Sequence, residues 1–254
     1  MRKAALSRHF SEELPVDYAG GKRYDGCNAS KKRGSGVERL TVITGHYGSG
    51  KTTFGLNLAC DLAAAGKRVT IIDLDIVNPY FRTEDHRAML EAKGVTVVSP
   101  PYANTNLDLP GLSAQIYGAL EREGEVILDV GGDDAGATAL GRFSHRIEER
   151  GYEMLCVINA RRSLTAEPEQ AAELLREIEQ ASRLQTTALV NNTHLKQLTE
   201  PQTVLASLPY AAEVSRLTGL PVRYTTAPKA LAAQLSEIPN LYPVEPFVLT
   251  PWGT

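Results

Sequence analysis

The stretch GHYGSGKT, from Gly45 to Thr52, constrains this chain more than any other part of its sequence. It fits the pattern G-x-x-x-x-G-K-[ST], which is typical of a loop that cradles phosphate groups. Glycines in such a loop can adopt positive φ, and this turns backbone N–H groups toward an anion. The predicted phosphate-binding residues are Gly45, Gly48, Ser49, Gly50, Lys51, Thr52 and Thr53.

The residues that close the motif carry its chemistry. Lys51 is a point charge that can reach β- and γ-phosphate oxygens. The Thr52 hydroxyl is an oxygen ligand of the kind that Mg²⁺ prefers. Residues 40–44 before the loop are apolar and β-branched, and apolar residues recur at helical spacing after it, from Phe54 until Gly66. The order strand, glycine loop, helix aims a helix N-terminus at the bound anion.

Two further apolar segments end in aspartates. Residues 68–75 (RVTIIDLD) end in Asp73 and Asp75, and residues 125–132 (EVILDVGG) place Asp129 before two glycines. Because ligands of open α/β sheets bind beyond the carboxyl ends of the strands, we expect these carboxylates beside the phosphates. The predicted Mg²⁺ ligands are Thr52, Asp73, Asp75 and Asp129.

Strands and helices alternate through residues 39–254, which predicts a single α/β domain: a doubly wound, mostly parallel sheet with helices on both faces. Residues 221–226 are expected to form the last strand. Residues 1–38 differ, since eight Lys and Arg residues against five acids give a net charge of +3. With poor periodicity, they are expected to form a flexible basic extension, either a solvated tail or an arm for an acidic partner.

Composition narrows the function classes. The net charge of -3 gives no strong nucleic-acid signal. No apolar run reaches the ~18 residues that span a bilayer, and the N-terminus shows no signal-peptide core. The three cysteines lie far apart without a C-x-x-C motif, which disfavours a disulfide framework and a shared iron–sulfur cluster. A reducing, cytoplasmic location is expected.

Polar segments follow other strands and are further candidates. Residues 100–110 (PPYANTNLDLP) are expected either to contact a substrate or partner or to form a rigid connector. Arg161 and Arg162 could reach a phosphate, but a solvated loop is the favoured interpretation. Asn191 and Asn192 carry amides that offer both a donor and an acceptor, which suits the edge of adenine; an Asn-rich turn is the alternative.

In order and spacing, the phosphate loop followed by Lys-Thr-Thr, the segment DLDIVNPYFR and the strand VILDVGG resemble the ParA/MinD/CobQ family of P-loop nucleotide-binding proteins. The resemblance covers residues 38–230. It implies ATP and Mg²⁺ as cofactors, with Lys51 and Asp75 as catalytic residues, the latter orienting the attacking water. It also implies Mg²⁺ support from Asp129, adenine recognition by one of the two asparagines, and a homodimer whose nucleotide state a partner senses.

One departure from that family concerns the residue after the first glycine of the loop. Family members typically carry a lysine there that reaches the partner subunit's phosphates, whereas this chain has His46. A neutral imidazole cannot replace a permanent cation. Either dimer catalysis is weak, or another cation such as Arg82 serves, or ATP is used differently.

Three functions follow from this resemblance. The first is a Mg²⁺-dependent ATPase that acts as a switch for a protein partner. The second is a ligase similar to CobQ and dethiobiotin synthetase, which would use ATP to activate a small carboxylic acid as substrate. The third is a nucleotide-binding scaffold that does not hydrolyse ATP.

Overall fold

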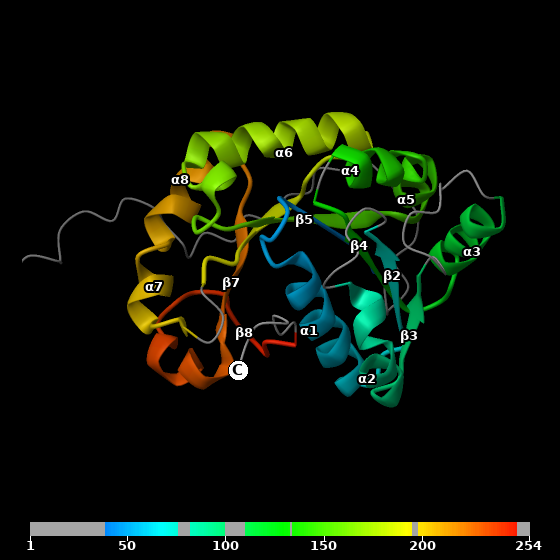
Figure 1. Ribbon diagram of the computed structural model, residues 1–254, viewed down its shortest axis with the longest axis horizontal. Coiled ribbons are helices and arrows are strands. Elements are labelled where there is room, and N and C mark those ends of the chain that lie inside the picture. The colour runs from blue at the N-terminus through cyan, green and yellow to red at the C-terminus, as the bar shows by residue number, and fades with distance from the viewer. Residues whose placement is uncertain (1–38, 76–81, 100–109, 133, 195–197, 248–254) are drawn as a thin grey trace, which may run out of the picture. The chain divides into compact units, whose positions relative to one another are not determined.

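The computed structural model describes residues 39–75, 82–99, 110–132, 134–194 and 198–247. The predicted basic extension, residues 1–38, and most of the predicted substrate or partner loop, residues 100–109, lie outside the described residues. Eight strands form one sheet in the order β3-β2-β4-β1-β5-β6-β7-β8, and all the described pairings are parallel (Figure 1). The predicted α/β fold class is confirmed.

The strands are short and mostly apolar. Their bounds are β1 Leu40–Thr44, β2 Val69–Leu74, β3 Val95–Val98, β4 Glu125–Val130, β5 Tyr152–Ile158, β6 Ala188–Asn191, β7 Val222–Pro228 and β8 Leu241–Val244. Every residue of β1, β2 and β4 is buried, as expected for parallel strands that are covered on both faces. The register places Asp73 of β2 opposite Asp129 of β4, so the two acidic strand ends lie side by side.

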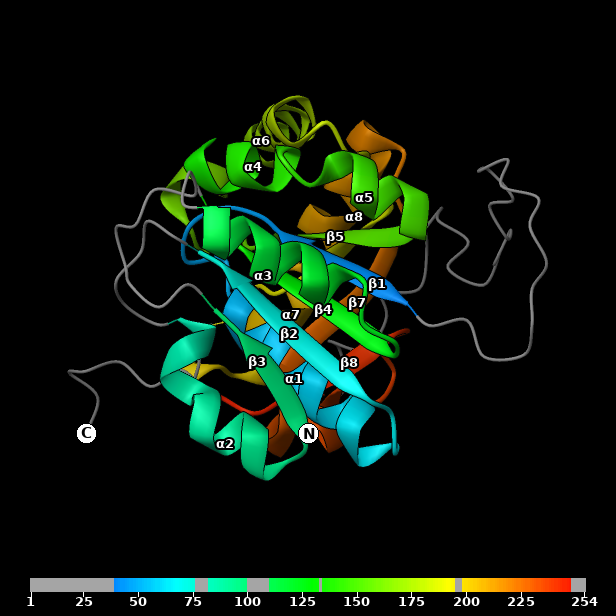
Figure 2. The ribbon, with the colours of Figure 1, turned by 90° about the vertical axis from the view of Figure 1, so that its right-hand side faces the viewer.

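Helices cover the two faces of the sheet (Figures 1 and 2). On one face lie α1 (Lys51–Ala64) and α2 (Arg87–Ala92). On the other lie α3 (Pro110–Leu120), α4 (Asp134–Gly141), α5 (Ser144–Arg150), α6 (Pro168–Ser182) and α8 (Leu208–Thr218). The short α7 (Pro201–Leu205) packs with the 3-10 helix η4 (Lys229–Leu235) beside β7. Within the described ranges, no helix is both long and apolar enough to cross a membrane.

The C-terminal part of the sheet corrects the sequence prediction. The strand expected to be the last, β7, pairs in parallel with a further strand, β8, with Thr225 opposite Leu241. Tyr242 of β8 packs edge-on against Phe54 of α1, with ring centroids 5.5 Å apart. A strand of four residues that contains a proline shows no periodicity, and its partners are distant in the sequence. Its existence therefore depends on tertiary contacts that the local pattern does not reveal.

Candidate functional site

The predicted phosphate loop joins the end of β1 to the start of α1. Gly45, Gly48 and Gly50 have φ angles of +134°, +70° and +97°. Gly50 is the N-cap residue of α1, and a Cβ built on it would lie 2.0 Å from Nδ2 of Asn192. The loop therefore has the backbone of a turn that presents a helix N-terminus to an anion, and it requires glycine at position 50.

We expect Gly50→Ala to lower the free energy of unfolding by about 2 kcal/mol, because it combines left-handed strain with a clash against the Asn192 amide. Denaturant unfolding of the purified variant measures this loss. Gly66→Ala is the matched control, since Gly66 also has positive φ (+78°) but nothing lies within 4 Å of its Cβ position. A Gly50 variant that loses no more stability than the Gly66 variant would contradict the packing described here.

A lysine, a backbone segment and a carboxylate meet at this loop. The buried Lys51 donates from Nζ to the carbonyl oxygen of His46 at 3.0 Å. The Gly132 carbonyl accepts the N–H of Tyr47 at 3.1 Å, and a Cβ on Gly132 would lie 2.6 Å from the Lys51 Nζ. Asp129 is 1% exposed, and its Oδ1 has no hydrogen-bond partner among the described residues. The ends of β1 and β4 thus converge as the sequence predicted.

The Asp129 carboxyl group fits a bound cation or a water molecule that the cation holds. Its Oδ2 accepts a hydrogen bond from the Thr83 hydroxyl at 2.9 Å, while Oδ1 is buried without a partner in the described structure. Burial raises the pKa of Asp129, and Lys51 and the Thr52 hydroxyl oppose this rise. A buried acceptor is costly unless a ligand satisfies it.

Mg²⁺ suits this sparse set of protein ligands, since it retains several waters and shares phosphate oxygens. The described residues contain no cluster of three or more His, Cys, Asp or Glu side chains that could hold a metal alone. Of the predicted ligands, Thr52 lies near enough to Asp129 for its hydroxyl to oppose the rise in the pKa of that carboxyl group.

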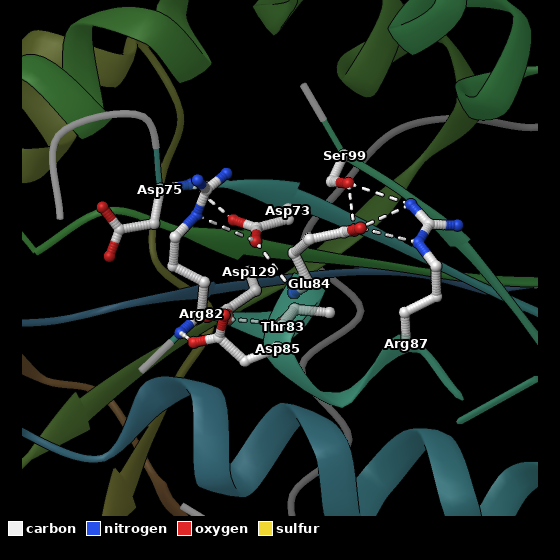
Figure 3. Close-up of polar contacts among 9 residues, drawn as sticks. All are labelled: Asp73, Asp75, Arg82, Thr83, Glu84, Asp85, Arg87, Ser99 and Asp129. Atoms are coloured by element: carbon white, nitrogen blue, oxygen red, sulfur yellow. Dashed lines mark hydrogen bonds and ion pairs between the residues drawn. The ribbon is translucent and has the colours of Figure 1, made fainter. Parts of the chain in front are cut away.

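Asp73 has a different setting from Asp129. It is fully buried, and it accepts the N–H of Asp75 on Oδ1 at 3.0 Å and the N–H of Glu84 on Oδ2 at 3.3 Å. Arg82 Nε lies 3.6 Å from the same Oδ2 (Figure 3). Burial and the neighbouring Asp129 raise the pKa of Asp73 to about 7, and Arg82 opposes the rise. These contacts suit a role for Asp73 in positioning the backbone after β2. Its role as a Mg²⁺ ligand stays a prediction.

The 3-10 helix η1 (Thr83–His86) links this site to the end of β3. Thr83 contacts Asp129, while the Glu84 carboxylate accepts hydrogen bonds from Arg87 Nη2 at 2.7 Å and from the Ser99 hydroxyl (Figure 3). Ser99 directly precedes the undescribed residues 100–109. No local sequence pattern indicates the Thr83 contact, because its partner is 46 residues away.

The two predicted adenine-binding asparagines are both buried and hydrogen-bonded. Asn192 Nδ2 donates to the Ser49 carbonyl at 2.6 Å, and Asn191 Nδ2 donates to Ser207 Oγ at 2.8 Å. A pocket of about 40 Å³ adjoins the loop, and its lining includes Ser49, Thr53, Asn159, Asn192, His194 and Val244. Whole small-molecule sites measure roughly 300–1,000 Å³, so this pocket fits only part of a ligand. Asn192 contributes to its lining, although its Oδ1 also accepts from the Thr226 hydroxyl and contacts His194 Nε2. Asn191 is not among the lining residues, and its amide is engaged by Ser207.

Arg162 makes a contact that the sequence did not predict. It is exposed, as a residue of the favoured solvated loop would be, and its Nε donates to the Gly48 carbonyl at 2.6 Å. The reason is topological: β5 pairs with β1, so the loop after β5 lies beside the loop after β1. This contact could have been predicted only from the strand order, because no local sequence pattern indicates it.

Comparisons with known proteins agree with this geometry. The model of the CobQ/CobB/MinD/ParA nucleotide binding domain (CbiA) matches residues 40–220. No curated protein matches the chain. Among solved structures, FtsY from Thermotoga maritima is 20% identical, with a TM-score of 0.54 over 75% of this chain and 62% of that one. FtsY from Elizabethkingia anophelis in complex with GDP is 20% identical, with a TM-score of 0.51 over 78% and 59% of the two chains.

A further similar structure is the Signal Recognition Particle 54 kDa protein from Aeropyrum pernix K1 in complex with GDP. It is 18% identical, with a TM-score of 0.51 over 76% of this chain and 42% of that one. This chain thus spans less than two thirds of each of these structures, and at such identities the likeness shows a shared fold. The family match over residues 40–220 shows that the chain belongs to the CobQ/CobB/MinD/ParA family of nucleotide-binding proteins.

Proposed function

We propose that this protein binds Mg²⁺ and ATP, hydrolyses the ATP, and acts as a nucleotide-driven switch for a protein partner. This proposal rests mainly on the convergence of Lys51, Gly132 and Asp129 at one phosphate loop, where Asp129 Oδ1 has no hydrogen-bond partner among the described residues. Phosphoryl transfer asks little covalent chemistry of a protein, so positioning and charge stabilisation suffice. A cytoplasmic homodimer is the setting that the family resemblance implies.

The proposed roles divide among the ends of three strands. After β1, the loop N–H groups and Lys51 bind the β- and γ-phosphates. Thr52 and Asp129 hold Mg²⁺, which supplies neutralisation of the phosphate charge when it is bound. Asp75, which follows β2 and is 9% exposed, orients the attacking water.

The pocket beside the loop supports ATP rather than GTP. Guanine offers two adjacent N–H donors on its Watson–Crick edge, which a carboxylate accepts well, whereas adenine offers one donor and one acceptor, which an amide matches. The described residues that line the pocket include Asn159, Asn192 and His194, and none of the described lining residues is Asp or Glu. The two similar structures with GDP carry no weight against this, because they share only the fold.

The ligase alternative has one structural observation in its favour. His46 stands where the family's second lysine would be, and its ring Nδ1 lies 2.7 Å from the Tyr47 carbonyl oxygen. It therefore faces its own loop rather than offering a cation to another subunit.

ADP release, measured with and without a panel of small carboxylic acids, separates these two functions. The switch predicts turnover that no acid stimulates. Acid-dependent ADP release, with ¹⁸O transferred from the labelled carboxylate to phosphate, would instead establish the ligase.

A further inference from the structure

Arg82 is a buried cation, and part of its hydrogen-bonding capacity has no partner among the described residues. It is 7% exposed, and its Nε and Nη2 have no hydrogen-bond partner among the described residues. Its ion-pair partner is Asp73, but the distance of 3.6 Å from Nε to Oδ2 is too long for a hydrogen bond. A guanidinium group stays charged in proteins, and buried donors without acceptors are costly. The side chain is therefore poised for an anionic acceptor.

Arg82 lies beside the predicted metal and phosphate site, so a bound phosphate is the nearest source of that acceptor. The hydroxyl of the next residue, Thr83, donates to Asp129 Oδ2. Asp73, the ion-pair partner of Arg82, lies opposite Asp129 in the sheet. In the view of Figure 3 the guanidinium lies between the side chains of Asp73 and Asp75. The Arg82 N–H donates to Asp85 Oδ2 at 3.0 Å, which fixes the backbone from which the side chain extends.

Asp73 is an incomplete hydrogen-bond partner for this guanidinium. Its oxygens already accept the N–H groups of Asp75 and Glu84. Arg82 Nε and Nη2 therefore keep donors that no acceptor among the described residues satisfies.

We propose that Arg82 forms a second anion site, which binds the terminal phosphoryl group of a nucleotide held by the same chain. It supplies in cis the permanent cation that position 46 lacks. The inference rests on the proposed function, because the phosphate loop must hold the nucleotide first. Since the side chain is buried in its own chain, it serves its own nucleotide, and hydrolysis needs no second subunit.

The chemical step leaves Arg82 unchanged. A water oxygen forms a bond to the γ-phosphorus, and the bond to the β–γ bridging oxygen breaks, so ADP departs with that electron pair. The proton lost by the water passes to solvent or phosphate. Arg82 only donates hydrogen bonds to the phosphoryl oxygens, whose charge is spread in the transition state.

The test compares Arg82→Ala and Arg82→Lys with the full-length wild-type protein. Arg176→Ala, an exposed position on α6, is the matched control. Three quantities are measured with Mg²⁺: affinity for ADP, affinity for the non-hydrolysable triphosphate AMP-PNP, and single-turnover ATP hydrolysis at several protein concentrations.

We expect Arg82→Ala to keep its ADP affinity and to lose roughly 10- to 100-fold in AMP-PNP affinity, the range for charge-assisted hydrogen bonds. Arg82→Lys should recover part of the affinity but little of the rate, since a lysine lacks the planar fork of donors. The wild-type rate per chain should not change with protein concentration, and Arg176→Ala should match the wild type.

Two results would overturn the inference while leaving the proposed function intact. One is an unchanged ratio of AMP-PNP to ADP affinity in both Arg82 variants. The other is a wild-type rate that rises with concentration, with Arg82→Ala rescued by mixing with Lys51→Ala subunits. If Arg82→Ala also loses ADP affinity, Arg82→Lys decides between the outcomes. A loss of AMP-PNP affinity alone in Arg82→Lys supports the site. An unchanged ratio of AMP-PNP to ADP affinity in that variant refutes it. Failure of the wild type to bind either nucleotide would refute the proposed function itself.

Discussion

Replacing Lys51 with alanine should weaken ATP binding by roughly 100-fold or more, the effect expected when one partner of a buried charged contact is removed. Lys51 is 6% exposed, and its Nζ is held at the His46 carbonyl, close to Gly132. Its charge also opposes the raised pKa of Asp129. Without the Lys51 charge, the negative charges of the phosphates and of the buried Asp129 carboxylate would repel each other without a cation to offset them. Calorimetric titration of the variant with ATP and Mg²⁺ measures the loss.

The control for this prediction is Lys93→Ala, which removes the same side chain from an exposed position that follows α2. It should leave ATP affinity unchanged. If Lys51→Ala bound ATP as well as this control does, the phosphate-loop assignment would be wrong.

Asp129→Asn should abolish the dependence of ATP binding on Mg²⁺. It should also reduce the rate of hydrolysis by roughly 100-fold or more, which is the loss expected when one electrostatic contact in an active site is removed. The amide keeps an oxygen that can accept from Thr83, so the fold should persist, but it lacks the negative charge that attracts a cation. Affinity measured with Mg²⁺ and with EDTA separates the metal's contribution from that of the loop. We expect the wild type to bind more tightly with Mg²⁺ and the variant to show no difference.

Glu177→Gln provides an acid-to-amide change on the exposed surface of α6 and should behave as the wild type does. Retention of both the Mg²⁺ dependence and the hydrolysis rate in Asp129→Asn would remove this carboxylate from the metal site. The Mg²⁺ ligand would then have to be sought at Asp73 or Asp75.

The parts of the site that the sequence predicted are those with local spacing. Gly45, Gly48 and Gly50 have the positive φ that the loop pattern requires, because turn chemistry is encoded within a few residues. The meeting of β1, β2 and β4 at one edge followed from three buried strands that end in functional residues. Parallel strands bring their carboxyl ends together, so the fold class and the side of the sheet could be predicted without a structure.

The parts that the sequence did not reveal depend on contacts between distant segments. The Thr83 hydroxyl reaches Asp129 across 46 positions, and Arg162 reaches Gly48 across 114. Neither contact produces a periodic pattern. The strand β8 was missed for the same reason, since its pairing with β7 and its packing on Phe54 are wholly tertiary.

Titration of the full-length protein with ATP and with GTP, each with Mg²⁺ and with EDTA, tests whether the phosphate loop is a Mg²⁺-dependent ATP site. We expect saturable binding of ATP at one site per chain, tighter with Mg²⁺ than with EDTA and tighter than the binding of GTP. Equal affinity for GTP would contradict the proposed base pocket. Absence of binding by either nucleotide at millimolar concentration would contradict the assignment of this loop as a nucleotide site.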